Sequence, residues 1–114
     1  AYSTRGELPD LPSNVALHPG WFAESLPPFL AAHPGPVRFL NVDCDLYAST
    51  RDALALLAPR LVPGSVLVFD DYLANPGWEG DEHRALEEAA QRFDLRHDWL
   101  AFSFFSRQAA IVIR

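Results

Sequence analysis

The sequence predicts an α/β fold in which parallel strands alternate with helices and an antiparallel pair of strands ends the sheet. Apolar segments of strand length alternate with amphipathic segments of helix length along most of the 114 residues. Residues 65–70 read SVLVFD and are apolar on both faces over Val66–Phe69, as in a strand in the middle of a parallel sheet covered by helices. Residues 97–114 contain two strand-like segments with a turn near residues 103–107, which favours a final hairpin.

The amino-terminal third has the weakest pattern. Residues 1–13 contain prolines and no hydrophobic period, so we expect an irregular arm. We expect a short strand over residues 14–18, stopped by the Pro-Gly pair that follows. Residues 21–33 carry apolar side chains at helical spacing, but Pro27 and Pro28 indicate two short helical pieces.

The central third contains the clearest strand–helix–strand unit. A strand of about six residues is predicted to end at Asp43, since six consecutive residues before it have strand character. A helix follows over residues 49–61, with Ser49 as its expected N-cap and Asp52 three residues later, close to a capping box. The second strand, residues 65–70, comes next. The apolar stripe of this helix is Leu54, Leu57, Ala58 and Leu61.

The last helix is predicted over residues 80–93 as a capped amphipathic segment. Its inward-facing side chains are Ala85, Leu86, Ala89, Ala90 and Phe93. The alternation of strands and helices implies a sheet with right-handed crossovers. Ligands bind beyond the carboxyl ends of the strands in such sheets, so two consecutive strands would deliver Asp43 and Asp70 to one crevice.

The composition argues against several classes of partner. Fifteen acidic and nine basic residues give a formal net charge of -6, which argues against a protein that binds nucleic-acid phosphates. No apolar run approaches the roughly 18 residues that a membrane span needs. The single cysteine, Cys44, has no internal disulfide partner, so we expect a cytoplasmic protein.

Two acidic pairs follow the two central strands. Asp43 and Asp45 come after the first strand, and Asp70 and Asp71 come after the second. Carboxylates gathered in one crevice repel each other and raise some of their pKa values. A hard divalent cation such as Mg²⁺ removes that conflict. The alternative is structural, because an aspartate after a strand often caps the following helix or turn.

Two known kinds of metal-dependent site share parts of this pattern. Nucleotide-sugar glycosyltransferases hold a metal with Asp-x-Asp after a strand, but the match is three residues long and the chain is short for that fold. Phosphatases of the haloacid dehalogenase type use Asp-x-Asp and a later Asp-Asp pair. Those phosphatases place most of their core domain between the two motifs, whereas one helix separates the motifs here.

A third family resembles far more of the chain. The pattern matches residues 39–78, which read FLNVDCDLYASTRDALALLAPRLVPGSVLVFDDYLANPGW. This segment is similar to the macrocin O-methyltransferases, which depend on S-adenosylmethionine and have the class I fold. In that family an Asp-x-Asp strand, a helix, a second strand ending in Asp-Asp-Tyr, a Pro-Gly-Trp segment and an acidic helix follow one another. The resemblance extends over roughly residues 8–114 and implies a Rossmann-like sheet.

The resemblance implies a magnesium ion held by Asp43, Asp70 and Asp71. It also implies that Asp43 lies beside the bound S-adenosylmethionine and acts as the general base for an acceptor hydroxyl. Asp45 is expected on the opposite side of the strand end, as a supporting or substrate-facing residue. The implied reaction is methylation of a hydroxyl group on a small molecule, such as a sugar of a natural product.

Three aromatic residues are candidates for ligand contacts. Tyr47 and Tyr72 follow the acidic pairs and are expected to line the acceptor pocket, with packing in its wall as the alternative. Trp21 lies where class I methyltransferases contact the adenine ring of the cofactor, and a place in the core is its alternative.

The chain departs from the family in one large respect, because it contains no Gly-x-Gly loop for the cofactor. We therefore expect residues 14–114 to be the carboxyl-terminal half of a methyltransferase domain, inactive alone. The strand that ends at Asp43 would then have an open edge. We expect residues 14–18 to be displaced, or that edge to be covered by another chain, since family members often form homo-oligomers. A non-catalytic association module is the alternative from another functional class.

Overall fold

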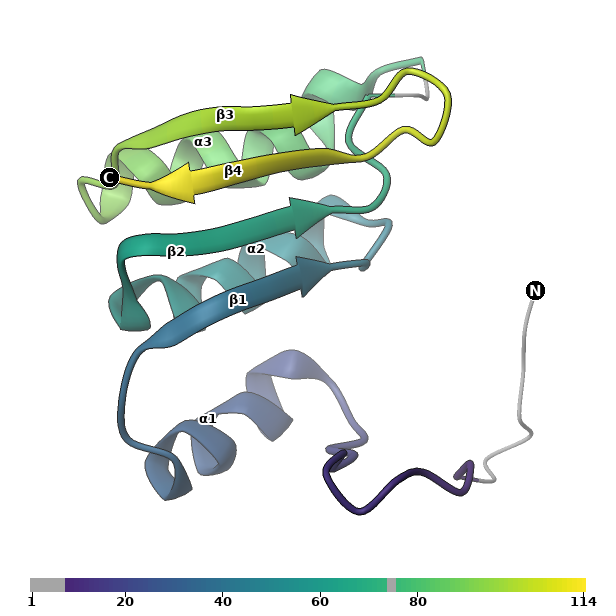
Figure 1. The fold of residues 1–114 in the computed structure, drawn as a ribbon, viewed down its shortest axis with the longest axis vertical. Helices are drawn as coiled ribbons and strands as arrows, with labels where there is room; N and C mark the ends of the chain where they lie inside the picture. Colours follow the sequence, from purple (N-terminus) through teal and green to yellow (C-terminus); the bar gives the residue numbers. More distant parts are fainter. Residues whose placement is uncertain (1–7, 74–75) are drawn as a thin grey trace.

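The computed structural model describes residues 8–73 and 76–114, which form a four-stranded sheet and three α-helices (Figure 1). Residues 1–7 of the expected arm lie outside the described residues. The strands are arranged in the order β1-β2-β4-β3. The elements in chain order are α1 (Phe22–Ala32), β1 (Val37–Val42), α2 (Tyr47–Leu57), the 3₁₀ turn η1 (Ala58–Arg60), β2 (Leu61–Phe69), the 3₁₀ turn η2 (Trp78–Gly80), α3 (Glu82–Arg92), β3 (His97–Phe102) and β4 (Ala109–Ile113).

The sheet has the mixed pairing that the sequence predicts. β1 and β2 are parallel, with Val42 opposite Phe69 at their carboxyl ends. β4 pairs antiparallel with both β2 and β3, so the hairpin formed by β3 and β4 completes the sheet. The predicted α/β class and the antiparallel ending are therefore confirmed.

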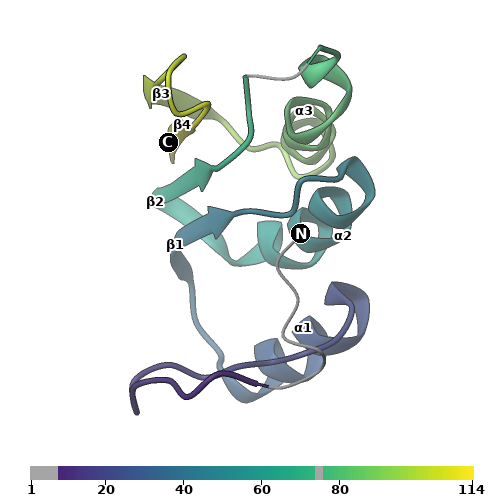
Figure 2. The ribbon, with the colours of Figure 1, turned by 90° about the vertical axis from the view of Figure 1, so that its right-hand side faces the viewer.

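The helices α2 and α3 cover one face of the sheet (Figure 2). Apolar side chains from alternate strand positions meet the helices there, because successive side chains of a strand point to opposite faces. α1 packs against α2 beside the β1 edge. The buried core is formed chiefly by Val42, Leu54, Leu57, Leu67, Phe69, Tyr72, Leu86, Ile111 and Ile113.

The other face of the sheet is not covered by any element of residues 8–73 and 76–114 (Figure 2). Its side chains are the alternate set, and register places Phe39 beside Val66 and Val68 beside Ala110. Phe39 is 63% exposed. β1 is an edge strand, which confirms the open edge expected for the strand that ends at Asp43. Among the described residues, no helix combines the length and the apolar character that crossing a bilayer requires.

Two expectations for the amino-terminal third are wrong. Residues 14–18 form no strand, since an extended segment becomes a strand only with a neighbour for its backbone groups; their exposed place outside the sheet agrees with the expectation that they are displaced. The helix α1 is one continuous helix, although Pro27 and Pro28 lie inside it. Proline removes N–H donors, but its φ angle is compatible with a helix, and Phe29 accepts a 3.0 Å bond from the amide of His33 beyond the prolines.

The boundaries of the central elements also differ from expectation. α2 begins at Tyr47, with Leu46 as its N-cap and no side-chain cap, so Ser49 lies inside the helix. Thr50 occupies the first turn, and its hydroxyl donates to the Leu46 carbonyl at 3.0 Å. Leu61 begins β2 instead of ending the helix. α3 likewise starts without a side-chain cap from Asp81.

An irregularity near the start of β2 explains why the strand is longer than expected. The pairing with β1 shifts between Val37, opposite Leu61, and Phe39, opposite Val66. The Ser65 hydroxyl stabilises this kink, because it accepts from the amide of Val62 at 3.0 Å and donates to the Val37 carbonyl at 2.6 Å. The strand then runs regularly to its acidic end.

Candidate metal centre

The acidic pairs lie together because β1 and β2 are adjacent and end at the same level. The amide of Asp70 donates to the carbonyl of Val42 at 2.9 Å, which continues the parallel ladder by one residue. Asp43 is the next residue after Val42, so its side chain emerges beside that of Asp70. This is the arrangement that the carboxyl-end rule predicts for consecutive parallel strands.

Three carboxylates of this cluster are close enough to share one cation. One oxygen from each of Asp43, Asp70 and Asp71 lies within 4.8 Å of the other two. Asp43 is exposed, and the other two side chains are half-buried, so the group opens toward solvent. The structure therefore brings together the three residues that the family resemblance assigns to the metal.

The electrostatics of the cluster are those of unneutralised carboxylates. The nearby charge of Asp70 is the main cause that raises the pKa of Asp43, and burial and Asp45 add to it. The pKa of Asp71 is raised chiefly by a side-chain hydrogen bond with Asp45 and then by burial. Each shift shows that adding positive charge here would be favourable.

Asp45 lies closer to this cluster than expected. Its backbone adopts a left-handed conformation, with φ 61°, so the chain is no longer extended at this residue. The Asp45 carboxyl reaches Asp71 instead of pointing to the opposite side of the strand end. Asp45 is therefore a neighbour of the metal-ligand candidates, and the expectation about its direction is wrong.

Glu82 is a fourth acidic group near the cluster, which the sequence analysis did not single out. Its Oε1 accepts from the amide of Asp71 at 3.1 Å, while Oε2 is buried without a hydrogen-bond partner. The side chain is 1% exposed, and burial raises its pKa to about 7. A sequence signal for Glu82 exists, because it lies three and four residues before Ala85 and Leu86, on the inward stripe of α3.

Gln108 is a second residue that the sequence analysis missed. It lies just before β4, and its side-chain amide donates to Oδ1 of Asp70 at 2.8 Å. This bond fixes one oxygen of Asp70 from the hairpin side. The hairpin is distant in sequence from both acidic pairs, so spacing along the chain gives no signal for this contact.

The donor set fits a hard divalent cation. Mg²⁺ prefers carboxylate oxygens, usually from a few residues, and keeps several waters or substrate oxygens. Asp43, Asp70 and Asp71 supply such oxygens from three residues, and the charge of Asp70 is the main cause that raises the pKa of Asp43. Glu82, whose Oε2 is buried without a partner, bonds through Oε1 to the amide of Asp71 beside these ligands.

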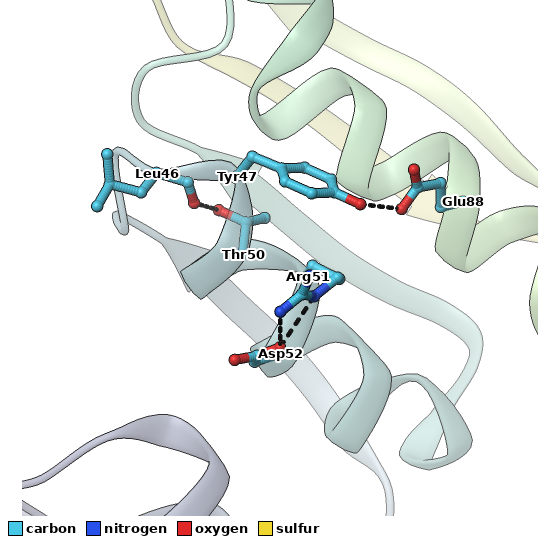
Figure 3. A network of polar contacts seen from close by, with 6 residues as sticks. All are labelled: Leu46, Tyr47, Thr50, Arg51, Asp52 and Glu88. Atoms are coloured by element: carbon cyan, nitrogen blue, oxygen red, sulfur yellow. Dashed lines mark hydrogen bonds and ion pairs between the residues drawn. The ribbon is translucent and has the colours of Figure 1, made fainter.

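Tyr47 points toward Glu88 on α3, as Figure 3 shows. Its hydroxyl donates to the carboxylate of Glu88 on α3, and the guanidinium of Arg84 lies 4.3 Å from its ring centroid. Arg51 pairs with Asp52 at 2.9 Å in the same exposed network. Tyr47 therefore joins α2 to α3, which corrects the expectation that it lines an acceptor pocket.

Tyr72 has the position expected of a pocket residue. Its ring is 2% exposed, and its hydroxyl hydrogen-bonds to Nδ1 of His83. The backbone amide of Tyr72 donates to the Arg107 carbonyl at 2.9 Å, which ties the acidic loop to the hairpin. Tyr72 lines an apolar cavity of about 330 Å³ together with Trp78 and Trp99.

Trp21 is not a core residue. It is the N-cap residue of α1 and is 77% exposed. The helix begins on the side of the sheet at which β1 and β2 end (Figure 1). Trp21 is therefore free to contact a ligand or another part of a larger protein, and its expected contact with the cofactor stays a prediction.

Comparison with solved structures supports the same architecture. A TDP-rhamnose 3'-O-methyltransferase of calicheamicin biosynthesis, CalS11, superposes with a TM-score of 0.62 at 29% identity, over 82% of this chain and 39% of that one. The O-methyltransferase NovP superposes with a TM-score of 0.63 at 27% identity, over 83% of this chain and 36% of that one. The expected Rossmann-like methyltransferase sheet is thus confirmed.

Curated relatives agree in sequence. The 8-demethyl-8-(2,3-dimethoxy-alpha-L-rhamnosyl)-tetracenomycin-C 4'-O-methyltransferase of Streptomyces olivaceus is 45% identical over 62 residues, 54% of this chain. The demethyldecarbamoylnovobiocin O-methyltransferase of Streptomyces niveus is 38% identical over 85 residues, 75% of this chain. The chain spans 23% and 30% of the lengths of these two proteins.

The match to a family description covers most of the sequence. Residues 7–102 match the model of the macrocin O-methyltransferases (TylF). That range includes β1, β2, α3 and all of the aspartates at the candidate metal centre. This chain therefore belongs to the macrocin O-methyltransferase family.

Proposed function

We propose that this chain supplies the metal-binding and acceptor-binding part of an S-adenosylmethionine-dependent O-methyltransferase that methylates a sugar hydroxyl of a natural product. The proposal rests on three carboxylate oxygens that lie within 4.8 Å of one another at the carboxyl ends of two parallel strands. Asp43, Asp70 and Asp71 would hold a Mg²⁺ ion, which would supply positive charge beside an acceptor hydroxyl.

The reaction needs a base for an alcohol, and Asp43 has the required properties. In methyl transfer a new O–CH₃ bond forms, the S–CH₃ bond of the donor breaks, and the hydroxyl proton must leave. The Asp43 carboxylate is exposed at the candidate metal centre, so it can reach an acceptor hydroxyl and receive that proton. Bound Mg²⁺ supplies the positive charge that lowers the pKa of the hydroxyl.

The neighbouring residues hold the carboxylates in place. Gln108 fixes Asp70 through a 2.8 Å bond, and Glu82 fixes the backbone of Asp71 through a 3.1 Å bond. Such support keeps the ligand oxygens oriented before the substrate arrives, which is the usual role of residues behind metal ligands. Asp45 adds a further carboxyl beside Asp71.

The sugar part of the proposal comes from the relatives. One acts on a rhamnosyl group of a tetracenomycin, and one solved structure is that of a TDP-rhamnose methyltransferase. A sugar with adjacent hydroxyls offers the oxygen pair that a magnesium ion held by carboxylates can orient.

Calorimetric titration of the chain with Mg²⁺ tests the proposal. We expect binding that Asp70→Asn weakens at least about tenfold, because the substitution removes a charged ligand. Asp94→Asn is the matched control, since it removes the same charge from an exposed residue after α3. Equal affinities for the two variants would refute a metal site at Asp43, Asp70 and Asp71.

The same titration should be repeated with S-adenosylmethionine. Binding of the donor by this chain would place its site within the 114 residues. Binding of the donor by a longer protein of the family, but not by this chain, would place the donor site outside the 114 residues. Either result leaves the metal measurement independent of donor binding.

A second candidate function is association without catalysis. It is favoured by the uncovered sheet face, on which Phe39 is 63% exposed, and by the free edge of β1. An association module needs no cation at the three aspartates. Absence of Mg²⁺ binding together with a concentration-dependent increase in mass would favour this function over methyl transfer.

A further inference from the structure

An apolar cavity adjoins the acidic cluster and has no role in the metal chemistry. Its volume is about 330 Å³. Pockets that bind small molecules are mostly apolar, with volumes of roughly 300–1,000 Å³. This cavity lies at the lower end of that range and therefore holds a ring system and not a whole acceptor. Six aromatic side chains line it: Tyr72, Trp78, His83, Trp99, Phe102 and Phe104.

The rings that form the walls come from separate elements and face one another. Tyr72 follows β2, and its ring centroid lies 5.3 Å from that of Trp99 on β3 and 6.0 Å from that of Trp78 in η2. The Trp99 contact is edge-to-face. A flat aromatic guest can continue such offset and edge-to-face arrangements, which are the geometries that aromatic rings prefer.

The cavity and the carboxylates share two pieces of backbone. Tyr72 lines the cavity and is bonded directly to Asp71. On the hairpin, Gln108 donates to Asp70 while the next residue, Ala109, lines the cavity. Register places Ala109 opposite Phe69, the last residue of β2. A ligand of modest length can therefore touch both places at once.

The rim of the cavity exposes unusually large apolar side chains. Trp99 is 44% exposed, Phe102 is 55% exposed and Phe104 is 80% exposed. Contiguous apolar surface of this kind marks a binding site more often than a free surface. Two polar atoms of the lining residues, the Tyr72 hydroxyl and Nδ1 of His83, hydrogen-bond to each other. An apolar ligand therefore leaves neither of them without a partner.

We propose that this cavity is a subsite for a flat aromatic ring system carried by the acceptor, while the acceptor's sugar hydroxyls lie at Asp43, Asp70 and Asp71. The inference rests on the proposed function, because it concerns the acceptor of that reaction. The two neighbouring surfaces differ in chemistry, one acidic and one aromatic, and they match the two ends of an aromatic glycoside. The ring system can be an aglycone or a nucleobase, since both present a flat π-face.

Binding of two simple glycosides to the 114-residue chain tests the subsite. The first is 4-methylumbelliferyl α-L-rhamnoside, which carries a flat bicyclic ring, and the second is methyl α-L-rhamnoside, which carries the same sugar alone. Both are titrated in the presence of Mg²⁺, and binding is followed by NMR. We expect the aromatic glycoside to bind about tenfold more tightly, equivalent to roughly 1.4 kcal/mol.

Two neighbouring phenylalanines provide a matched pair of variants. Phe104 lines the cavity and Phe105, which is 100% exposed, does not. Neither residue is buried, so neither substitution removes a core contact. Phe104→Ala should remove most of the preference for the aromatic glycoside, and Phe105→Ala should retain it. A titration with thymidine distinguishes an aglycone from a nucleobase as the ring system. A nucleobase subsite would bind thymidine and lose that binding in Phe104→Ala, whereas an aglycone subsite would not bind it.

Three results would overturn the subsite. The two glycosides could bind equally, the two variants could lose the preference equally, or Phe104→Ala could convert a dimer to a monomer without changing glycoside binding. The last result would make the aromatic rim an interface between two copies. The proposed function fails separately, through loss of Mg²⁺ binding or through insensitivity of methyl rhamnoside binding to Mg²⁺ and to Asp70→Asn.

Discussion

The two faces of the sheet differ more than any other two regions of this molecule. On the covered face, Phe69 and Ile111 are fully buried against α2 and α3. On the open face, Phe39 is 63% exposed, and the residues beside it are only half-buried. Sheets with parallel strands normally have both faces covered. The difference teaches that α2 and α3 complete the packing of one face, whereas no element of residues 8–73 and 76–114 packs on the other.

The candidate metal centre lies where the two faces meet. Asp70 follows Phe69 directly, and its backbone remains bonded to Val42. Tyr72, two residues later, returns to the covered side and is buried. The buried Tyr72 and the hairpin contacts of Gln108 and Arg107 therefore anchor the acidic loop, which explains how the three carboxylates stay together without a second layer.

The largest expected effect comes from truncating one phenylalanine on each face. Phe69→Ala should destabilise the chain by about 3–5 kcal/mol, because it leaves a cavity in the core. Phe39→Ala should change the free energy of unfolding by less than about 0.5 kcal/mol, as for other exposed positions. Urea denaturation followed by circular dichroism measures both. Equal losses would mean that the open face is packed in solution.

The next largest effect is the pH dependence of stability caused by Glu82, the buried carboxyl at the start of α3. Its pKa is raised from 4.5 to about 7 by burial, so the folded chain binds this proton more tightly than the unfolded chain. The resulting stabilisation is complete below about pH 4.5 and is lost as the pH rises through 7. We expect the free energy of unfolding to fall by roughly 1–3 kcal/mol between pH 5 and pH 8.

Substitution of Glu82 isolates its share of that pH dependence. Glu82→Gln should flatten the slope and make the chain relatively more stable at pH 8, since the amide needs no proton. Glu87→Gln is the control, because Glu87 is exposed on the same helix. Urea denaturation midpoints at pH 5 and pH 8 measure the pH dependence of stability for each variant. An identical pH dependence in Glu82→Gln and Glu87→Gln would exclude Glu82 as its cause.

A smaller effect is expected from the cation. Mg²⁺ at ten times its Kd should stabilise the chain by about 1.4 kcal/mol, which follows from mass action. The gain should be larger at pH 8 than at pH 5, because the raised pKa values of Asp43 and Asp71 let protons compete for the same oxygens. Thermal melts with and without Mg²⁺ measure it, and a gain that survives in Asp71→Asn would point to another site.

The smallest effect is expected at Tyr47. Tyr47→Phe removes the exposed bond to Glu88 and should leave both the unfolding midpoint and Mg²⁺ affinity nearly unchanged. Surface contacts of this kind contribute little. A clear loss of metal affinity would restore Tyr47 to the site, in conflict with its direction toward α3 in Figure 3.

Much of the site could be predicted because its geometry is local to two strands. The apolar runs that end at Asp43 and Asp70 define parallel neighbours, and parallel neighbours bring their carboxyl ends together. Two acidic pairs alone fit several classes of metal-dependent protein. The continuous motif over residues 39–78 indicates one of these classes, the macrocin O-methyltransferases. Both inferences need only the order of elements along the chain.

The remaining features depend on contacts between distant segments. Gln108 reaches Asp70 across the hairpin, and the direction of Asp45 depends on a left-handed backbone that no local pattern specifies. The sequence does not predict the start of α2 at Tyr47, because the helix has no side-chain cap that a sequence pattern could indicate. Residues 14–18 have strand-like composition, but the sheet offers them no neighbour, so tertiary context overrides propensity.

The central claim is that Asp43, Asp70 and Asp71 bind one divalent cation, and paramagnetic NMR tests it most directly. Mn²⁺ is added in small amounts to the ¹⁵N-labelled chain, and excess Mg²⁺ is then used to displace it. The account predicts selective broadening of amide signals at residues 43–45 and 70–72, reversed by Mg²⁺ and absent in Asp70→Asn. Broadening spread over acidic residues elsewhere, or broadening unchanged in Asp70→Asn, would contradict the account.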